Sequence, residues 1–216
     1  MDAEKYQIAD EDASAPSEEP DDITGILAGL TGQNQTGKLL PFTDVPKSHY
    51  AADAIRWAWE NGWFSGVSGK RFAPEQGLSR AMLVTVLWRM EGEPRHGISG
   101  FTDVLPGGWY EKAVAWAAFS GIVSGTAEGV FSPDAAITRE QLAVILWRYA
   151  GSPQPSGSLN GFADAGEVSA YAAEAMAWAV EQGIVTGSNG SLLPKSGATR
   201  AQTALMLQRF AARQAQ

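Results

Sequence analysis

The chain has 216 residues, 44% of them hydrophobic, and a formal net charge of −8. This length and apolar content allow a sizeable core, and the lack of cysteine excludes disulfides and thiolate metal sites. No apolar run approaches the ~20 residues that a membrane-spanning helix needs, so we expect no membrane insertion.

The negative charge lies at the N-terminus. Residues 1–22 carry nine acidic side chains and one lysine, whereas acidic and basic residues balance in the rest of the chain. Because this acidic, Pro- and Ser-containing stretch cannot bury much apolar surface, residues 1–41 are predicted to be a disordered tail or linker, which could include a short helix at 23–30. A charge-balanced body lacks the basic surface that phosphate backbones attract, which argues against nucleic acid as a partner.

From residue 42 onward, one pattern occurs three times at intervals of about 60 residues. Each copy opens with Phe-x-Asp, continues with an Ala-rich stretch and two glycines four residues apart, and ends with Ser/Thr-Arg before an apolar run. We place the copies at 42–97, 98–157 and 158–216, with joints rich in Gly, Pro and Ser between them. Repetition of this kind predicts a repeat architecture, here one three-part unit of helix–loop–helix copies.

The Ala-rich stretch predicts the first helix of each copy. In the second copy this helix should run from Trp109 to Ser120, with almost no polar face. A helix that is apolar nearly all round is buried on several sides, so we expect the three first helices to pack against one another at the centre. Trp57, Trp116 and Trp178 recur at one position of these helices, which favours core packing over stacking on a ligand.

A loop with two glycines follows each first helix. The first glycine falls where the helix must stop, as expected for a left-handed cap; these residues are Gly62, Gly121 and Gly183. The second would admit a ligand close to backbone N–H groups, although a turn alone explains it equally well; these residues are Gly66, Gly125 and Gly187. The loop should fold back as a tight turn or small hairpin and end in an apolar plug, namely Phe72, Phe131 or Leu192.

The second helix of each copy begins after a hydroxyl residue that suits an N-cap, namely Ser79, Thr138 or Thr199. Gln141 and Gln202 stand three residues on and complete a capping box, whereas the first copy has Met82 at this position. The first copy should therefore have the weaker cap.

An arginine occupies the first position of each second helix, namely Arg80, Arg139 or Arg200. The helix dipole disfavours a cation there by about 0.3–1 kcal/mol, so we expect an anionic partner. A carboxylate ligand would suit this position, because the helix start offers N–H donors and arginine offers a planar fork. The structural alternative is that each arginine pairs with an aspartate of Phe-x-Asp or binds carbonyl groups of a neighbouring repeat.

Two further sets of residues are candidates for contact with a ligand. For the aspartates of Phe-x-Asp, a capping or turn role is favoured over hydrogen bonds to a ligand; these are Asp44, Asp103 and Asp164. Among the tryptophans that do not recur in all three copies, Trp63 and Trp109 lie near loops and are the better candidates for stacking.

The whole pattern resembles the S-layer homology domain family. The order Phe-x-Asp-Val, Ala-rich helix, Gly-turn loop, Phe-x-Pro, Ile/Leu-Thr-Arg and apolar helix is similar to that family's, over Phe42 to about Ala212, and Ile137-Thr138-Arg139-Glu140 is closest to its signature. The resemblance implies a mainly α fold in which three tandem repeats form one pseudo-threefold unit with a central helical bundle and three prongs. All copies keep the arginine and lose the final Glu of the usual Thr-Arg-Ala-Glu, and the third departs most, so its groove is expected to be altered or inactive.

The resemblance also implies binding rather than catalysis. In that family, grooves between prongs hold secondary cell-wall polysaccharide, often through a pyruvate-ketal sugar, and anchor exported proteins to the wall. We therefore expect a cell-surface location, a wall polysaccharide as partner, an upstream domain or cargo protein, and no cofactor. The first residues lack the basic start and apolar core of a signal peptide, so the chain is either cytoplasmic or truncated at Met1.

The sequence also bears on two other function classes, an enzyme and a protein-interaction scaffold. An enzyme is disfavoured, because His49 and His96 are the only histidines and no nucleophile triad, metal-ligand spacing or phosphate-binding glycine loop is present. A protein-interaction or self-assembly scaffold is the main alternative, since helical repeats commonly bind proteins through the surface between their units.

Overall fold

A computed structural model describes residues 40–95 and 97–214, and over this part of the chain the regular secondary structure is helical. The six α-helices of these described residues are α2 (Ala52–Glu60), α3 (Arg80–Met90), α4 (Glu111–Phe119), α5 (Arg139–Tyr149), α6 (Ala173–Glu181) and α7 (Arg200–Gln214). Two 3₁₀ turns, η1 (Ala165–Glu167) and η2 (Ala170–Ala172), precede α6. The predicted mainly α fold with three helix–loop–helix repeats is confirmed, whereas the tail to residue 39, its helix at 23–30 and His96 lie outside the described residues.

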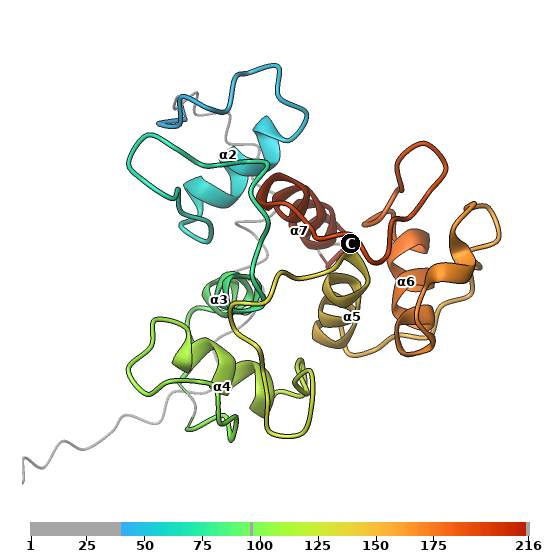
Figure 1. Cartoon of the computed structure of the whole chain (residues 1–216). Coiled ribbons are helices and arrows are strands. Elements are labelled where there is room, and N and C mark those ends of the chain that lie inside the picture. Colours follow the sequence, from blue (N-terminus) through green and yellow to red (C-terminus); the bar gives the residue numbers. More distant parts are fainter. Residues whose placement is uncertain (1–39, 96, 215–216) are drawn as a thin grey trace, which may run out of the picture.

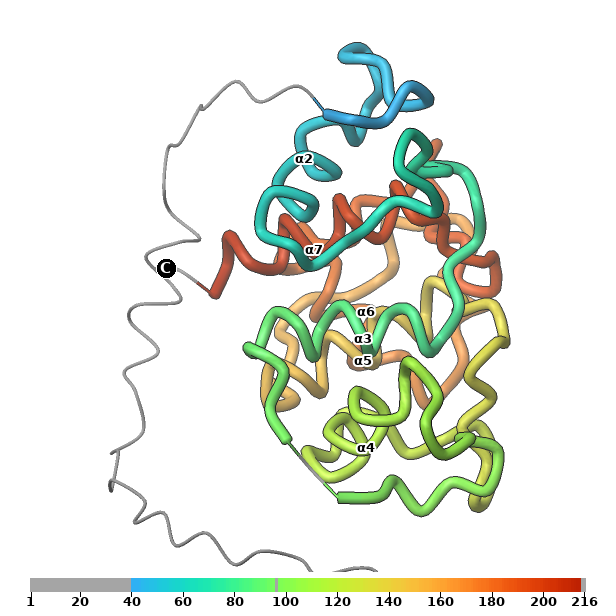
Figure 2. The backbone as a smooth tube through the Cα atoms, turned by 90° about the vertical axis from the view of Figure 1, so that its left-hand side faces the viewer, coloured from blue at the N-terminus to red at the C-terminus, as the bar shows by residue number. Residues whose placement is uncertain are grey.

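The helices pair across the repeats. The second helix of each repeat packs on the first helix of the next, so that α3 contacts α4, α5 contacts α6, and α7 returns to contact α2. Figure 1 shows these three pairs around a common centre, with α3, α5 and α7 closest to it and α2, α4 and α6 outside, and Figure 2 shows the same pairs from the side. None of the described helices is long and apolar enough to cross a bilayer.

The prediction that the first helices pack against one another at the centre is wrong. Each lies instead at the periphery, where its alanines allow close contact with one second helix. On α4, for example, Phe119 at the end of the helix is 78% exposed to solvent. The predicted start of α4 at Trp109 was two residues too early, because Tyr110 is the N-cap and the helix begins at Glu111. Trp116 and Trp178 are buried in the core as predicted, whereas Trp57 is only partly buried.

Three backbone hydrogen bonds close a ring where the repeats meet. The N–H of Leu78 donates to the oxygen of Ala198, that of Ala198 to Ile137, and that of Ile137 back to Leu78, each at 2.9 Å. All three residues are fully buried. Each repeat gives one bond and accepts one, so the three repeats depend on one another. The pseudo-threefold symmetry of the whole unit stays a prediction.

Loop and cap chemistry follow the sequence closely. The helix-terminating glycines adopt φ values of 75°, 70° and 67°, as a left-handed cap requires; they are Gly62, Gly121 and Gly183. The plugs Phe72, Phe131 and Leu192 are completely buried, and each follows a short antiparallel bridge. Thr138 and Gln141 form the predicted capping box, with bonds of 3.3 and 3.2 Å, and Thr199 and Gln202 form its equivalent.

Candidate functional site

Each arginine of the Ser/Thr-Arg motif reaches the loop of the next repeat. Its Nε donates to the carbonyl oxygen of the plug residue, at 2.8 Å from Arg80 to Phe131, 2.7 Å from Arg139 to Leu192 and 2.8 Å from Arg200 to Phe72. Arg80 and Arg200 are buried, and Arg139 is half-buried. The structure therefore contains the carbonyl contact that was the alternative reading of these arginines, and none of the three forms an ion pair with a described aspartate.

The helix starts themselves are already occupied. At α3, the N–H of Arg80 donates to Ala135 and that of Ala81 donates to Pro133, both at 3.0 Å. The next N–H, from Met82, donates to the Ser79 hydroxyl at 3.3 Å, and the other two second helices make the equivalent backbone bonds. The expectation that a ligand uses unpaired N–H donors here is wrong, because the neighbouring repeat supplies their acceptors. At this position, only the guanidinium group is left to bind an anion.

The aspartates of Phe-x-Asp bind the other side of the same plug residue. Asp103 accepts from the N–H of Phe131 at 2.8 Å and from that of Ser132 at 2.7 Å, one bond to each oxygen. Asp44 holds Phe72 and Ala73 in the same way, and Asp164 holds Leu192 and Leu193. Desolvation acts to raise the pKa of Asp103, but these bonds outweigh it, so the pKa lies below its ordinary value. With both oxygens engaged, we leave these aspartates out of the proposed ligand contacts.

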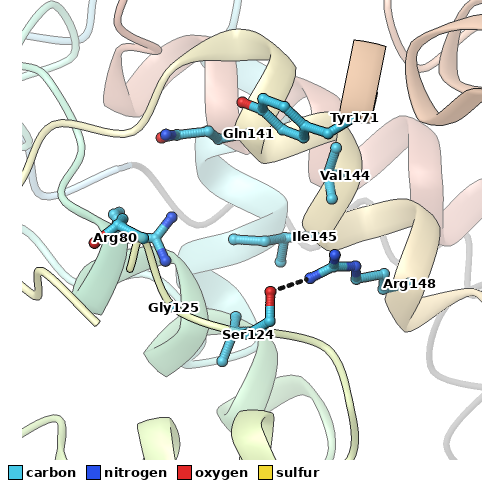
Figure 3. Close-up of a pocket in the computed structure, with 10 residues that line it drawn as sticks. Arg80, Ser124, Gly125, Gln141, Val144, Ile145, Arg148 and Tyr171 are labelled. Atoms are coloured by element: carbon cyan, nitrogen blue, oxygen red, sulfur yellow. Dashed lines mark hydrogen bonds between the residues drawn. The ribbon is translucent and has the colours of Figure 1, made fainter. Parts of the chain in front are cut away.

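A cavity of about 340 Å³ lies where all three repeats contribute side chains. Arg80 comes from the first repeat, Ser124, Gly125, Gln141 and Arg148 come from the second, and Tyr171 comes from the third. Figure 3 shows the Arg80 guanidinium pointing into this space, with Arg148 and Tyr171 on the opposite side. The volume suits a small ligand such as one or two sugar rings.

The cavity carries two cations. Among the described residues, neither Arg80 nor Arg148 has a carboxylate within 4.0 Å. Arg148 donates to the Ser124 hydroxyl at 3.1 Å, and the Arg80 guanidinium carbon lies 4.9 Å from the centre of the Phe131 ring. Burial lowers the pKa of Arg80, which expresses the cost of holding a charge away from water without an anion. An anionic ligand in the cavity would offset that cost.

Arg200 has different surroundings. In addition to its bond to Phe72, its Nη2 donates to the Ser65 oxygen at 2.6 Å. Its guanidinium carbon lies 4.7 Å from the centre of the Phe64 ring and 4.5 Å from that of Phe72. Burial lowers its pKa to about 10. A second cavity, of about 330 Å³, lies beside this loop and is lined by Phe42, Gly66 and neighbouring residues without an arginine.

The second glycine of each pair is required by packing. A Cβ on Gly125 would lie 2.5 Å from the Val130 oxygen and 2.9 Å from the Phe101 ring, closer than the structure allows. Gly66 and Gly187 meet Phe42 and Phe162 in the same way, at 2.5 and 2.7 Å. The opening Phe of every repeat therefore demands this glycine whether or not a ligand binds, although Gly125 also lines the Arg80 cavity.

The two tryptophans proposed for stacking lie outside the Arg80 cavity. Trp63 is half-buried and packs edge-on against Trp57, with ring centres 4.9 Å apart. Trp109 is 58% exposed and packs edge-on against Tyr110 at 5.1 Å.

A family comparison accounts for the repeats. The S-layer homology domain model matches residues 41–81, 100–143 and 161–204, more than half of the chain. The chain belongs to the S-layer homology domain family. This family is a non-catalytic anchoring domain, and the matched segments include all three arginines and all three aspartates discussed above.

Curated relatives of this S-layer homology chain differ in kind. The surface-layer 125 kDa protein of Lysinibacillus sphaericus is 31% identical over 75% of this chain and 14% of its own length. A cellulosome-anchoring protein of Acetivibrio thermocellus is 29% identical over 64% of the chain and 33% of its own length. An endoglucanase of Bacillus sp. strain KSM-635 is 28% identical over 84% of the chain and 20% of its own length. The chain thus spans at most a third of these proteins, one of which is named as an enzyme.

Sequence reasoning missed Arg148 and Tyr171, which also line the Arg80 cavity. Tyr171 stands immediately before the N-cap of α6, as Tyr50 and Trp109 do for α2 and α4. The three side chains are 57–58% exposed. An aromatic residue in the same exposed position of every repeat is the sequence signal for Tyr171, although the residue is Tyr in two repeats and Trp in the other.

Proposed function

We propose that this module anchors a longer protein to the cell wall by binding a carboxylate-bearing wall polysaccharide in the Arg80 cavity. The observation that carries the proposal is a buried guanidinium group that faces a cavity shared by three repeats and has no carboxylate partner among the described residues. Arginine binds carboxylates in a planar, charge-assisted manner. A pyruvate-ketal sugar presents such a carboxylate on a small ring that the cavity can hold.

The relatives support the same location and role. Two of those described above are named for the surface layer and for anchoring, and the family itself is an anchoring domain. We accordingly propose a cell-surface location, with any catalytic activity residing in other parts of the full-length protein.

Retention by purified wall sacculi tests the proposal. The module should bind intact sacculi and lose most of that binding when the attached polysaccharide is removed chemically. Arg148→Ala should weaken retention at least tenfold, since Arg148 faces the cavity and its side chain donates a hydrogen bond to Ser124. Retention that is unchanged on stripped sacculi would contradict glycan binding.

A protein-interaction scaffold is the second candidate, and one feature favours it. The second repeat exposes several large apolar side chains, with Ile98 at 90%, Leu105 at 66% and Trp109 at 58%. Where exposed apolar side chains form a contiguous patch, they commonly mark a contact with another protein. Binding to stripped sacculi that is abolished by Ile98→Asp and Leu105→Asp would support this function in place of glycan recognition.

A further inference from the structure

Glu140 at the start of α5 is a buried carboxylate with partners from another repeat. It is 3% exposed. Its oxygens accept from the Ser169 N–H at 3.0 Å, the Ser169 hydroxyl at 3.0 Å, the Tyr171 hydroxyl at 2.9 Å and the Lys195 ammonium group at 2.8 Å. All of these donors belong to the third repeat. Glu140 thus ties the second helix of one repeat to the segment that precedes α6.

The bond to Tyr171 reaches the ligand cavity. Tyr171 lines the cavity opposite Arg80 (Figure 3), yet its side chain is 58% exposed. An exposed aromatic side chain samples several rotamers unless it is held. A hydrogen bond to an ionised carboxylate is about twice as strong as a neutral one, so it restricts Tyr171 to one orientation.

Lys195 makes this carboxylate compatible with an anionic ligand. Its ammonium group lies 2.8 Å from Glu140 and also donates to the Ser169 hydroxyl. Desolvation acts to raise the pKa of Glu140, but the bonds from Lys195, Ser169 and Tyr171 outweigh it, so the pKa lies below its ordinary value. Glu140 is therefore ionised at neutral pH, and the adjacent cation reduces its repulsion of an acidic sugar.

The other two junctions lack this device. Ala81 and Ala201 occupy the position equivalent to Glu140 and are fully buried. The equivalent exposed aromatics are Trp109 and Tyr50. Tyr50 has the Thr199 side chain as its hydrogen-bond partner, where Tyr171 has a carboxylate. An extra buried acid at one junction out of three calls for a role specific to that junction.

We propose that Glu140 is a positioning residue for the ligand site: it fixes the Tyr171 ring across the cavity from Arg80, where the ring packs on the face of a sugar whose carboxylate the arginines bind. This inference rests on the proposed function. Preorganisation of a contact group increases affinity because less freedom is lost on binding. The Arg80 cavity should accordingly be the principal polysaccharide site of the chain.

Titration calorimetry with wall polysaccharide released from purified sacculi tests the proposal. Glu140→Ala introduces the residue of the other repeats and should weaken binding about tenfold while the chain remains folded. Glu174→Ala removes an exposed acid from α6 and should leave affinity unchanged. Tyr171→Phe should weaken binding to a similar extent, and the double variant should be no weaker than either single variant, because both changes release the same ring.

Two results would overturn the inference. One is unchanged affinity in Glu140→Ala; the other is a double variant whose loss is the product of the two single losses, which would mean that Glu140 acts without Tyr171. A readout independent of ligand comes from NMR of labelled tyrosine: burial and the Glu140 bond raise the Tyr171 pKa to about 12, and in Glu140→Ala it should fall toward its ordinary value. Binding lost in Arg80→Ala but kept in Glu140→Ala refutes only the inference, whereas a native chain that binds no polysaccharide refutes the proposed function as well.

Discussion

The junctions at Arg80 and Arg200 share one backbone framework and differ in what surrounds the guanidinium group. In both, the arginine Nε donates to the plug residue of the next loop and an aspartate binds that residue's N–H. At Arg200 a second carbonyl and two aromatic rings complete the surroundings, whereas at Arg80 the group faces a cavity. The repeated motif therefore builds the same backbone framework at both junctions, and residues outside it make the surroundings of the two guanidinium groups different.

Removing the aspartate of Phe-x-Asp should lower the free energy of unfolding equally at the two junctions. Asp103→Ala and Asp44→Ala each leave two backbone N–H groups without acceptors, one of them on a residue with φ near 60°. Losing these bonds should lower the free energy of unfolding by about 2–4 kcal/mol in each variant. Chemical denaturation measures this, with the exposed Asp134→Ala as the control. A loss at only one of the two sites would show that the junctions are not equivalent in their framework.

Replacing Arg200 or Arg80 by alanine should affect stability and wall binding to different extents. Arg200→Ala removes two hydrogen bonds and the contacts with two rings, and should cost about 2–3 kcal/mol of unfolding free energy. Arg80→Ala removes one hydrogen bond and the contact with one ring, and should cost about 1–2 kcal/mol. Wall retention should change in the opposite order, falling strongly in Arg80→Ala and little in folded Arg200→Ala. The same order in both measurements would contradict the assignment of the cavity.

Loss of a capping box should have a smaller effect. Thr138→Ala removes the hydroxyl that accepts from Gln141 and should lower the free energy of unfolding by about 1 kcal/mol. Ser79→Ala, at a cap without the reciprocal bond, should cost less. Thermal or chemical unfolding of the two variants checks this, and an equal loss would mean that the glutamine contributes nothing.

The smallest expected effect is a change in acid sensitivity. The pKa of Asp103 lies below its ordinary value of 3.8 in the folded chain, so its contribution to stability is present above that value and disappears as the pH falls through the lower folded pKa. Asp103→Asn should therefore lose less stability than the native chain as the pH falls below about 3.8. Denaturation midpoints measured from pH 5 to pH 2 test this, and parallel curves would contradict it.

The sequence predicted those features that depend on neighbouring residues. Glycine caps, capping boxes and buried plugs each follow from a short stretch of chain, and their outcomes match. The pairing of the helices could not be predicted in this way, because each pair joins a second helix to a first helix of another repeat. The ring of bonds through Leu78, Ile137 and Ala198 likewise joins all three repeats, and no single repeat contains it.

The recurrence of some residues in only two repeats also has a structural explanation. The indole N–H of Trp88 donates to the Pro94 oxygen, and that of Trp147 donates to Pro153, both at 2.8 Å. These bonds hold the joints that lead into the next repeat. The equivalent position in the third repeat is Gln208, which has no indole N–H to donate. Tyr171 and Glu140 escaped prediction because their contact spans two repeats.

The most direct test of the account compares Arg148→Ala with Arg89→Ala in titrations with released wall polysaccharide. The two arginines occupy equivalent positions, but Arg148 lines the Arg80 cavity, whereas Arg89 donates to the Trp63 oxygen and pairs with Glu93. We predict that Arg148→Ala loses at least tenfold in affinity and that Arg89→Ala binds as the native chain does. Equal affinities of the two variants would contradict the claim that the cavity at Arg80 is the ligand site.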